Sequence, residues 1–419
     1  MTKGREIPGL TRTILEESWL AWPAEVIMAT LTGYRSRGLQ RLSSSVFSDM
    51  ERARRAAVAR GQQVINLSVG SPDLPPAPHI VERLHEALDN PGNYGYPMAD
   101  LPEFREAVAG WYERRFGVKV ASQEQVVGVM GSQDGLAHVC LAICNPGDLV
   151  LVPDPGYPIY TAGPVLAGME LYPLPLQAEN DFLPDLDAVP PQVWERARVM
   201  LLNYPSNPLS ATADLAFFRR VVHLAERHGV IVCHDAAYSE LAFDGYRPPS
   251  FLQVPGAMEV GIEFNSLSKT FNLAGCRVGY ALGNERVIAA LAEVKSHLDY
   301  GIFRPIQEAA IAALTGPQGP VVELARTYQR RRDALVEGLN GLGWKVPAPR
   351  ATMFVWAPLP PGWKSYDFAL RLVERTGVTV VPGVGFGELG EGYVRIALVQ
   401  DLKLMREAVR RVGASGLFK

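Results

Sequence analysis

Short apolar runs that alternate with helical runs constrain the fold of this chain more than any other feature of its sequence. The strand-like runs lie at 126–130, 149–152, 170–173, 199–202, 230–233, 262–265 and 278–282. Amphipathic helical runs at 214–228 and 286–295 lie between or after them. Strands that alternate with helices favour a mostly parallel α/β sheet, and in such a sheet the functional groups collect at the strand ends.

The sequence on both sides of this region has a different pattern of predicted helices and strands. A strand-like run at 64–69 ends in a tight turn, and long helices with a few short strands follow residue 300. We therefore expect an N-terminal extension (1–40), an arm with part of a small domain (41–76), a large domain (77–300) and a small α+β domain (301–419). The extension is apolar and carries two tryptophans. It would pack on the domain or on a partner subunit, with a membrane-surface helix as the alternative.

Composition excludes several classes of function. The 419 residues hold 41 Lys plus Arg against 44 Asp plus Glu, so no overall basic field favours nucleic acid or an anionic membrane. No apolar run reaches the ~18 residues of a membrane-spanning helix. The four cysteines show neither metal-ligand spacing nor a dense disulfide framework, so we expect no metal site and a reducing cytoplasm. The partner predicted by these numbers is a small molecule.

The stretch 265–280 contains the most closely spaced set of reactive and polar side chains in the chain. Lys269 follows Ser266 and Ser268 and precedes Arg277, so a reactive amine lies among hydroxyls and a cation that would hold a phosphate. The alternative is a surface loop with solvated charges. The run resembles the cofactor-lysine signature Ser-x-Ser-Lys-x-x-x-x-x-Gly-x-Arg-x-Gly of class I and II aminotransferases, which are fold type I pyridoxal phosphate enzymes. The resemblance implies that Lys269 bonds the cofactor and then moves a proton between the substrate and the cofactor.

Pyridoxal phosphate also needs an anion beside its ring nitrogen. Asp235 ends an apolar run, and Tyr238 follows it with the spacing of the family. The resemblance implies that Asp235 keeps the ring protonated and that Tyr238 donates to the phenolate oxygen of the cofactor. An aspartate after a strand is otherwise often a helix cap.

Two further segments resemble the family around the cofactor ring. Asn203-Tyr-Pro-Ser-Asn-Pro208 resembles Asn-Pro-x-Asn-Pro-Thr-Gly, which implies that Asn207 also contacts the phenolate oxygen and lies beside the substrate. The chain departs from this pattern at Leu209 and Ser210, where Thr and Gly are usual. Tyr157 in Asp154-Pro-Gly-Tyr-Pro158 matches the aromatic residue that stacks on the ring, although such a run is first of all a turn.

A phosphate requires backbone N–H groups at the start of a helix, together with hydroxyls and a cation. Gly131-Ser132-Gln133 opens a predicted helix and would supply the N–H groups, while Ser266, Ser268 and Arg277 would supply the hydroxyls and the cation.

In this family a tyrosine of the neighbouring subunit reaches the phosphate as well. Tyr96 is the match and Tyr94 its rival, because the loop is one residue shorter than usual. The resemblance thus implies a homodimer with shared active sites.

The substrate carboxylate calls for an arginine, because a planar guanidinium meets a planar carboxylate through two hydrogen bonds. Arg395 in Tyr393-Val-Arg-Ile-Ala-Leu398 matches the Arg-Ile-Ala element of the family, the alternative being an arginine in a surface ion pair. Gly70 would let bare backbone approach the same carboxylate. The predicted substrates are an amino acid and a 2-oxo acid.

Together the matches imply the fold type I architecture, a mostly parallel seven-stranded-type sheet with a smaller α+β domain. Several motifs are most similar to the LL-diaminopimelate aminotransferase branch, which implies LL-diaminopimelate and 2-oxoglutarate as substrates and a role in lysine biosynthesis. Ser45 and His297 depart from that branch, so the amino donor stays open. A β-eliminating C–S lyase on the same fold is the alternative activity, and a non-catalytic sensor domain of a transcription regulator is another. The latter would need a DNA-binding module that some 40 preceding residues do not supply.

Overall fold

A computed structural model describes residues 34, 36–42 and 46–417. By their contacts, residues 1–43 and residues 44–419 form separate units. Within the first, one short helix is described, α2 (Arg37–Arg41), and the Ser36 side chain caps it by accepting from the Leu39 amide. Most of the predicted N-terminal extension, together with Ser45, lies outside the described residues.

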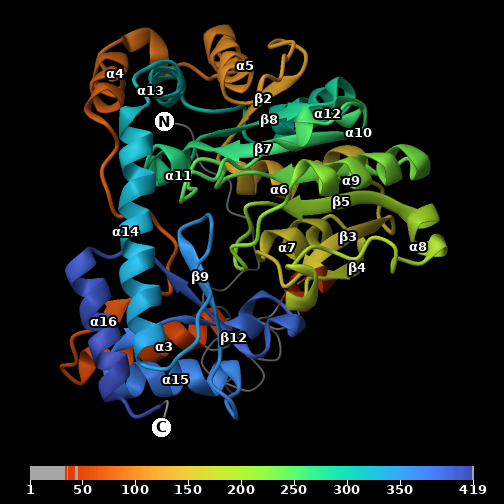
Figure 1. Cartoon of the computed structure of the whole chain (residues 1–419). Helices are drawn as coiled ribbons and strands as arrows, with labels where there is room; N and C mark the ends of the chain where they lie inside the picture. The colour runs from red at the N-terminus through yellow and green to blue at the C-terminus, as the bar shows by residue number, and fades with distance from the viewer. Residues whose placement is uncertain (1–33, 35, 43–45, 418–419) are drawn as a thin grey trace, which may run out of the picture. The chain divides into compact units, whose positions relative to one another are not determined.

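The second unit is built around a seven-stranded sheet with the order β2-β8-β7-β6-β5-β3-β4 (Figure 1). Its strands are β2 (Val126–Val129), β3 (Leu149–Asp154), β4 (Glu170–Pro175), β5 (Ala197–Asn203), β6 (Ile231–Asp235), β7 (Gly261–Ser266) and β8 (Gly279–Gly283). β8 runs antiparallel to both of its neighbours, and the other pairs are parallel. The predicted mostly parallel α/β sheet is confirmed.

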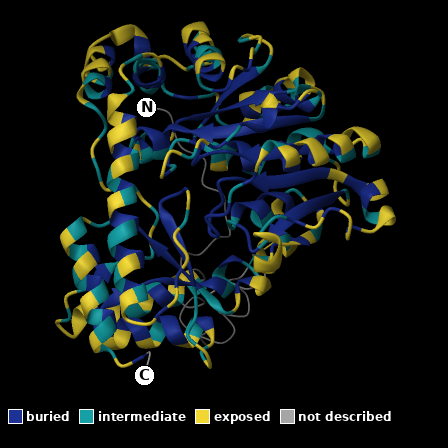
Figure 2. Cartoon of the chain, viewed as in Figure 1, coloured by how far each residue is buried: buried dark blue, intermediate teal, exposed yellow. Residues whose placement is uncertain are grey.

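Helices cover both faces of this sheet because its central strands are apolar on both sides. In β5, Val199 and Leu201 join one core, while Met200 and Leu202 join the core on the opposite face. Figure 2 shows these strands as buried and the outer sides of the helices as exposed. The first core contains α6 (Ser132–Ile143), α7 (Ile159–Leu166) and α12 (Glu285–Leu298), and the second contains α4 (Pro78–Leu88), α5 (Pro102–Phe116), α8 (Pro191–Arg196), α9 (Leu215–His228), α10 (Ala257–Val260) and α13 (Arg304–Thr315).

A separate core joins the C-terminal elements to the start of the unit. It packs α3 (Val46–Ala59), α14 (Gly319–Gly341), α15 (Ser365–Thr376) and α16 (Leu402–Ala414) around the sheet β11-β12-β9 and the pair β1-β10. These strands are β1 (Ile65–Asn66), β9 (Phe354–Pro358), β10 (Val378–Thr379), β11 (Val381–Pro382) and β12 (Tyr393–Ala397). In Figure 1, α14 runs from the helices α4 and α13 to this C-terminal group. The small α+β part predicted from the sequence is therefore present.

Some expectations need correction. The strand predicted at 64–69 is only two residues long, because its pairing partner β10 is equally short. The sequence analysis missed α7 and α8, which are too short for a clear helical period. The division into domains remains a proposal. Helix α13 contacts α4 and α5 and joins the core of the large sheet. We therefore place the boundary between the large and the small domain near α14. No described helix is both long and apolar enough to cross a membrane.

Candidate functional site

A pocket of about 360 Å³ lies where parallel strands of the large sheet end. β5 ends at Asn203 and β6 ends at Asp235, and these two residues are paired in register. The short helix α11 (Leu267–Thr270) follows β7 directly and carries Lys269. The pocket brings together all the predicted site residues except Tyr96: Gly70, Ser132, Gln133, Tyr157, Asn207, Asp235, Tyr238, Ser266, Ser268, Lys269, Arg277 and Arg395.

The amine of Lys269 is poised for nucleophilic chemistry. Ser266 caps α11 by accepting from the Ser268 amide, so the lysine is held on a fixed turn of helix. Its Nζ donates to the Gly70 carbonyl at 2.8 Å. Burial, together with the nearby Arg395 and Arg277 guanidinium groups, lowers the pKa of this amine to about 8. About a tenth of the amine is therefore neutral at pH 7, and the neutral amine is the form that attacks a carbonyl group.

Asp235 is a buried carboxylate without a cationic partner of its own. Tyr160 OH donates to its Oδ2 at 2.9 Å, and the Ala237 amide donates to its Oδ1 at 3.2 Å. Burial raises the pKa of Asp235 to about 6, although these hydrogen bonds act in the opposite direction. Within residues 46–417 no salt bridge reaches it. A positively charged group bound in the pocket would complete the pair.

Arg395 enters the pocket from β12 and is held from two sides. Its Nη1 donates to Asn207 Oδ1 at 2.9 Å and its Nη2 donates to the Ser68 carbonyl at 2.7 Å. The guanidinium lies 4.3 Å from the ring centre of Phe354, a cation–π contact. Burial lowers the pKa of Arg395 to about 10. Its Nε is buried and finds no hydrogen-bond partner among the described residues, so donor capacity remains for an anion.

Tyr238 lines the same pocket as Arg395. Asn207 Nδ2 donates to the Tyr238 hydroxyl oxygen at 3.4 Å. Burial raises the pKa of this phenol, so it stays protonated and able to donate. The asparagine thus joins the tyrosine to Arg395, and all three point polar atoms at one small volume.

The start of α6 forms an anion cradle with the turn after α11. Gly131 precedes α6 with φ of +79°, and a Cβ at this position would lie 2.5 Å from Arg277 Nη2, so glycine is required. Arg277 donates to the Met130 and Ala274 carbonyls and keeps an exposed guanidinium at the rim. Ser268 Oγ is buried and has no hydrogen-bond partner within the described part of the chain. Helix N–H groups, a free hydroxyl and a fixed cation together suit a phosphate.

Three predicted aromatic residues take different places. Tyr157 OH donates to Gln133 Oε1 at 3.0 Å, which sets this ring against the start of α6. Tyr96 does not line the pocket of its own chain, since its side chain is 76% exposed and its ring packs on Tyr300 at 5.4 Å. Tyr94 is also exposed, and its hydroxyl donates to the Leu88 carbonyl. The contact of Tyr96 or Tyr94 with a neighbouring subunit stays a prediction.

Among the pocket residues that the sequence analysis missed, Tyr160 and Phe354 support predicted site residues. Tyr160 donates to Asp235, and its signal was the spacing of three from Tyr157, which places both rings near one another at the start of a helix. Phe354 supports Arg395 and also packs on Gly70, where an added Cβ would lie 2.5 Å from its ring. Nothing local in the sequence distinguishes Phe354 from a core residue.

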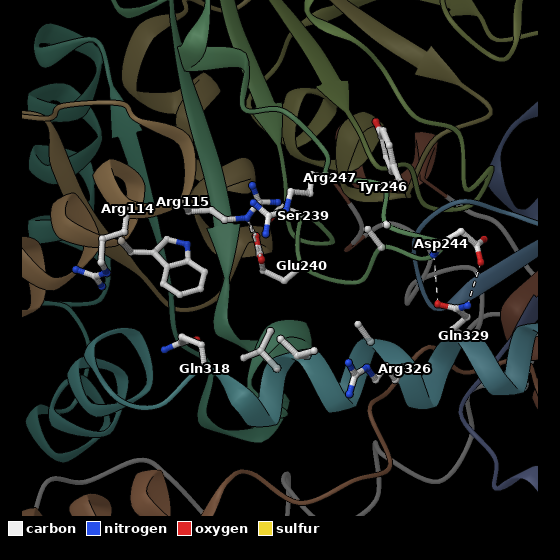
Figure 3. A pocket seen from close by; sticks show the side chains of 16 residues that line it. Arg114, Arg115, Ser239, Glu240, Asp244, Tyr246, Arg247, Gln318, Arg326 and Gln329 are labelled. Carbon is white, nitrogen blue, oxygen red and sulfur yellow. Dashed lines mark hydrogen bonds and ion pairs between the residues drawn. The ribbon is translucent and has the colours of Figure 1, made fainter.

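A second pocket, of about 610 Å³, lies between α5, α14 and the segment 239–247 (Figure 3). Its two carboxylates are already paired. Arg115 Nε donates to both oxygens of Glu240 at 3.0 and 3.1 Å, and Gln329 Nε2 donates to Asp244 Oδ1 at 2.9 Å. This pocket is larger than the one around Lys269, yet it contains none of the predicted site residues.

Comparisons with known proteins agree on one family. Residues 62–412 match the family model described as aminotransferase class I and II. A protein of Moorella thermoacetica named LL-diaminopimelate aminotransferase is 50% identical over 378 residues, which are 90% of this chain and 97% of that protein. A protein of the same name from Syntrophobacter fumaroxidans is 50% identical over 90% of this chain and 98% of its own length.

Solved structures show the same similarity in three dimensions. Substrate-bound BacF from Bacillus subtilis is 39% identical, with a TM-score of 0.88 over 91% of this chain and 98% of that one. A probable N-succinyldiaminopimelate aminotransferase from Thermus thermophilus is 42% identical, with a TM-score of 0.84 over 88% of this chain and 100% of the other.

Proposed function

This chain belongs to the class I and II aminotransferases, and from that premise we propose that it uses pyridoxal phosphate to move an amino group from LL-diaminopimelate to 2-oxoglutarate. The observation that carries this proposal is the meeting of Lys269, Asp235 and Arg395 in one pocket. They meet three separate demands of such chemistry: a neutral amine, a buried anion and a carboxylate clamp. The substrates are supported by relatives with that name, which match about nine-tenths of the chain at half identity.

The residues of the pocket fit pyridoxal phosphate. Among residues 46–417, Asp235 is a buried carboxylate that lacks a cation, as a partner for a protonated ring nitrogen should be. Ser268 Oγ is a buried donor to which no described residue is bonded, and it lines the pocket with Arg277, as a phosphate would require. The two ends of the cofactor are thus each matched by an unsatisfied group. Bound pyridoxal phosphate supplies an electron sink for the negative charge that forms on the substrate α-carbon.

In the proposed mechanism the protein binds the substrate, orients it and moves one proton. Arg395 binds the substrate carboxylate through two parallel hydrogen bonds, using Nε and an Nη group. Lys269 would hold the cofactor through Nζ. As a neutral amine, favoured by its lowered pKa, Lys269 would accept the proton from the substrate α-carbon.

The remaining pocket residues hold charge in place. Asp235 would hold the protonated ring nitrogen, and Tyr160 keeps this carboxylate in position through its hydroxyl. Tyr238 and Asn207 would hold the cofactor oxygen that carries negative charge. Gly70 leaves room for the substrate, since any side chain there would displace Phe354.

We also propose a homodimer and a cytoplasmic location. Tyr94 and Tyr96 are 62% and 76% exposed and pack on Phe303 and Tyr300 respectively, so they form a surface suited to a second copy of this chain. The four cysteines are free, which fits a reducing compartment. Sedimentation of the purified protein checks the dimer, and a monomer at all concentrations would contradict it.

The direct experiment incubates the purified protein with pyridoxal phosphate, LL-diaminopimelate and 2-oxoglutarate. Glutamate should accumulate with the loss of both substrates, and Lys269→Ala should form it at least about a hundredfold more slowly. A parallel incubation with cysteine or cystathionine should release no pyruvate. Pyruvate and ammonia without glutamate would instead indicate the β-eliminating lyase. Transfer from other amino acids but not from LL-diaminopimelate would keep the aminotransferase and reject the substrate.

A further inference from the structure

Two strained residues face each other between the segment after Asn207 and the start of β9. Ser210 has φ of +58° and Thr352 has φ of +77°, and both are buried. Positive φ is unfavourable for a residue with a side chain, above all for a β-branched one such as threonine. Strain of this kind persists only where the surrounding contacts hold it, and it clusters at functional sites. Ser210 also stands where the resemblance to the family expects glycine.

Hydrogen bonds join these residues in a closed ring. Ser210 Oγ donates to the Phe354 carbonyl at 2.9 Å, which uses its only proton. Thr352 Oγ1, 2.8 Å away, must therefore be the donor in the pair with Ser210 Oγ. The Phe354 amide donates to Thr352 Oγ1 at 3.2 Å and closes the ring. Both hydroxyls are thus fully used, and both backbone groups of Phe354 are held.

The ring connects two segments that hold Arg395. Ser210 lies three residues after Asn207, whose Oδ1 accepts from Arg395 Nη1. Phe354 belongs to β9, and its ring lies 4.3 Å from the guanidinium carbon of the same arginine. β9 pairs with β12, where Trp356 is opposite Arg395. The carboxylate clamp is therefore bounded on one side by the 207–210 segment and on the other by β9.

We propose that the Ser210–Thr352 hydroxyl pair is a latch that fixes the orientation of Arg395 toward the substrate carboxylate. Ser210 and Thr352 act as positioning residues, since neither touches Arg395 directly. The latch makes the serine at position 210 functional, because a glycine would accept the same backbone angle without strain but could not bond Phe354. The inference rests on the proposed function, which takes Arg395 as the carboxylate clamp.

The experiment compares Ser210→Gly with the unaltered holoenzyme. KM for LL-diaminopimelate and KM for 2-oxoglutarate should both rise by about tenfold, since each substrate presents a carboxylate to the loosened arginine. The maximal rate should fall less, and the affinity for pyridoxal phosphate and its absorbance spectrum should not change. Thr352→Ser, which keeps the hydroxyl, should behave as the unaltered enzyme. Asp181→Gly is the matched control, because Asp181 also has a positive φ, of +52°, but is exposed.

A structural role alone would give a different pattern. Ser210→Gly would then lower the melting temperature and leave both KM values unchanged, and this outcome would overturn the latch while the aminotransferase stands. If Ser210→Gly does not fold, Thr352→Val removes the other hydroxyl of the pair, and KM for both substrates then tests the latch in the same way. If the unaltered protein transfers no amino group at all, the proposed function and the latch fail together.

Discussion

Two pockets of this protein differ in how their charged groups are paired. The one between α5 and α14 has paired carboxylates, whereas the smaller one around Lys269 contains, within the described part of the chain, a buried carboxylate without a cation, an unpartnered serine hydroxyl and an arginine with an unpartnered Nε. Buried polar groups are normally satisfied, because leaving one unpaired costs roughly 1–3 kcal/mol. Among the described residues, unpartnered atoms also line other pockets, such as Gln318 Oε1 in the pocket between α5 and α14. The site is therefore marked by its unpaired charged groups, Asp235 and Arg395, and not by pocket size.

Removal of the amine should give the largest effect. Lys269→Ala should lower the transamination rate by roughly 10²–10⁴-fold for the lost proton transfer alone. Borohydride should no longer fix the cofactor to the protein, which peptide mapping would detect. Lys345→Ala, at an exposed lysine, serves as the control. Labelling that persists in the Lys269 variant would move the site to another lysine.

Replacement of the arginine clamp should come next. Arg395→Lys keeps the charge but removes the planar pair of donors, so kcat/KM should fall by roughly 10–100-fold, mainly through KM. Steady-state kinetics with both substrates measure it. An unchanged KM for both would mean that the carboxylate binds elsewhere, and the contrast between the pockets would lose its main support.

The pH dependence of Lys269 should be a smaller, graded effect. In the protein without cofactor, the rate of bonding to pyridoxal phosphate should rise about tenfold per pH unit and level off near pH 8, because the pKa of this amine is about 8. The unfolded chain binds the proton more tightly, so between about pH 8 and 10.5 this group makes stability rise with pH. Stopped-flow absorbance follows the rate. A rate still rising at pH 10 would indicate an ordinary lysine.

A change in the larger pocket should affect stability alone. Arg115→Ala leaves Glu240 without the Nε donor that bonds both of its oxygens, so the free energy of unfolding should fall by about 1–3 kcal/mol. Both KM and kcat should stay as they were. Thermal unfolding measures the loss of stability, and steady-state assays measure KM and kcat. A loss of activity in the folded variant would assign a function to this pocket.

Much of the fold followed from local patterns. Apolar runs predicted each strand of the large sheet within a few residues, because a strand buried on both faces needs a continuous apolar segment. The pairing of β1 with β10 did not follow, since a two-residue contact between distant segments leaves no periodic signal. Likewise α7 was missed, although it places Tyr160 beside Asp235.

The sequence by itself determined which chemical groups this protein has and the order in which they follow the strands. Lys269, Asp235 and Arg395 were predicted because each stands in a motif that resembles a signature of the class I and II aminotransferases. The tertiary structure alone decided their electrostatic state and their supports. Burial and long-range contacts lower the pKa of Lys269, raise that of Asp235 and join Ser210 to Thr352. These effects depend on groups brought together from distant segments, which no local pattern encodes.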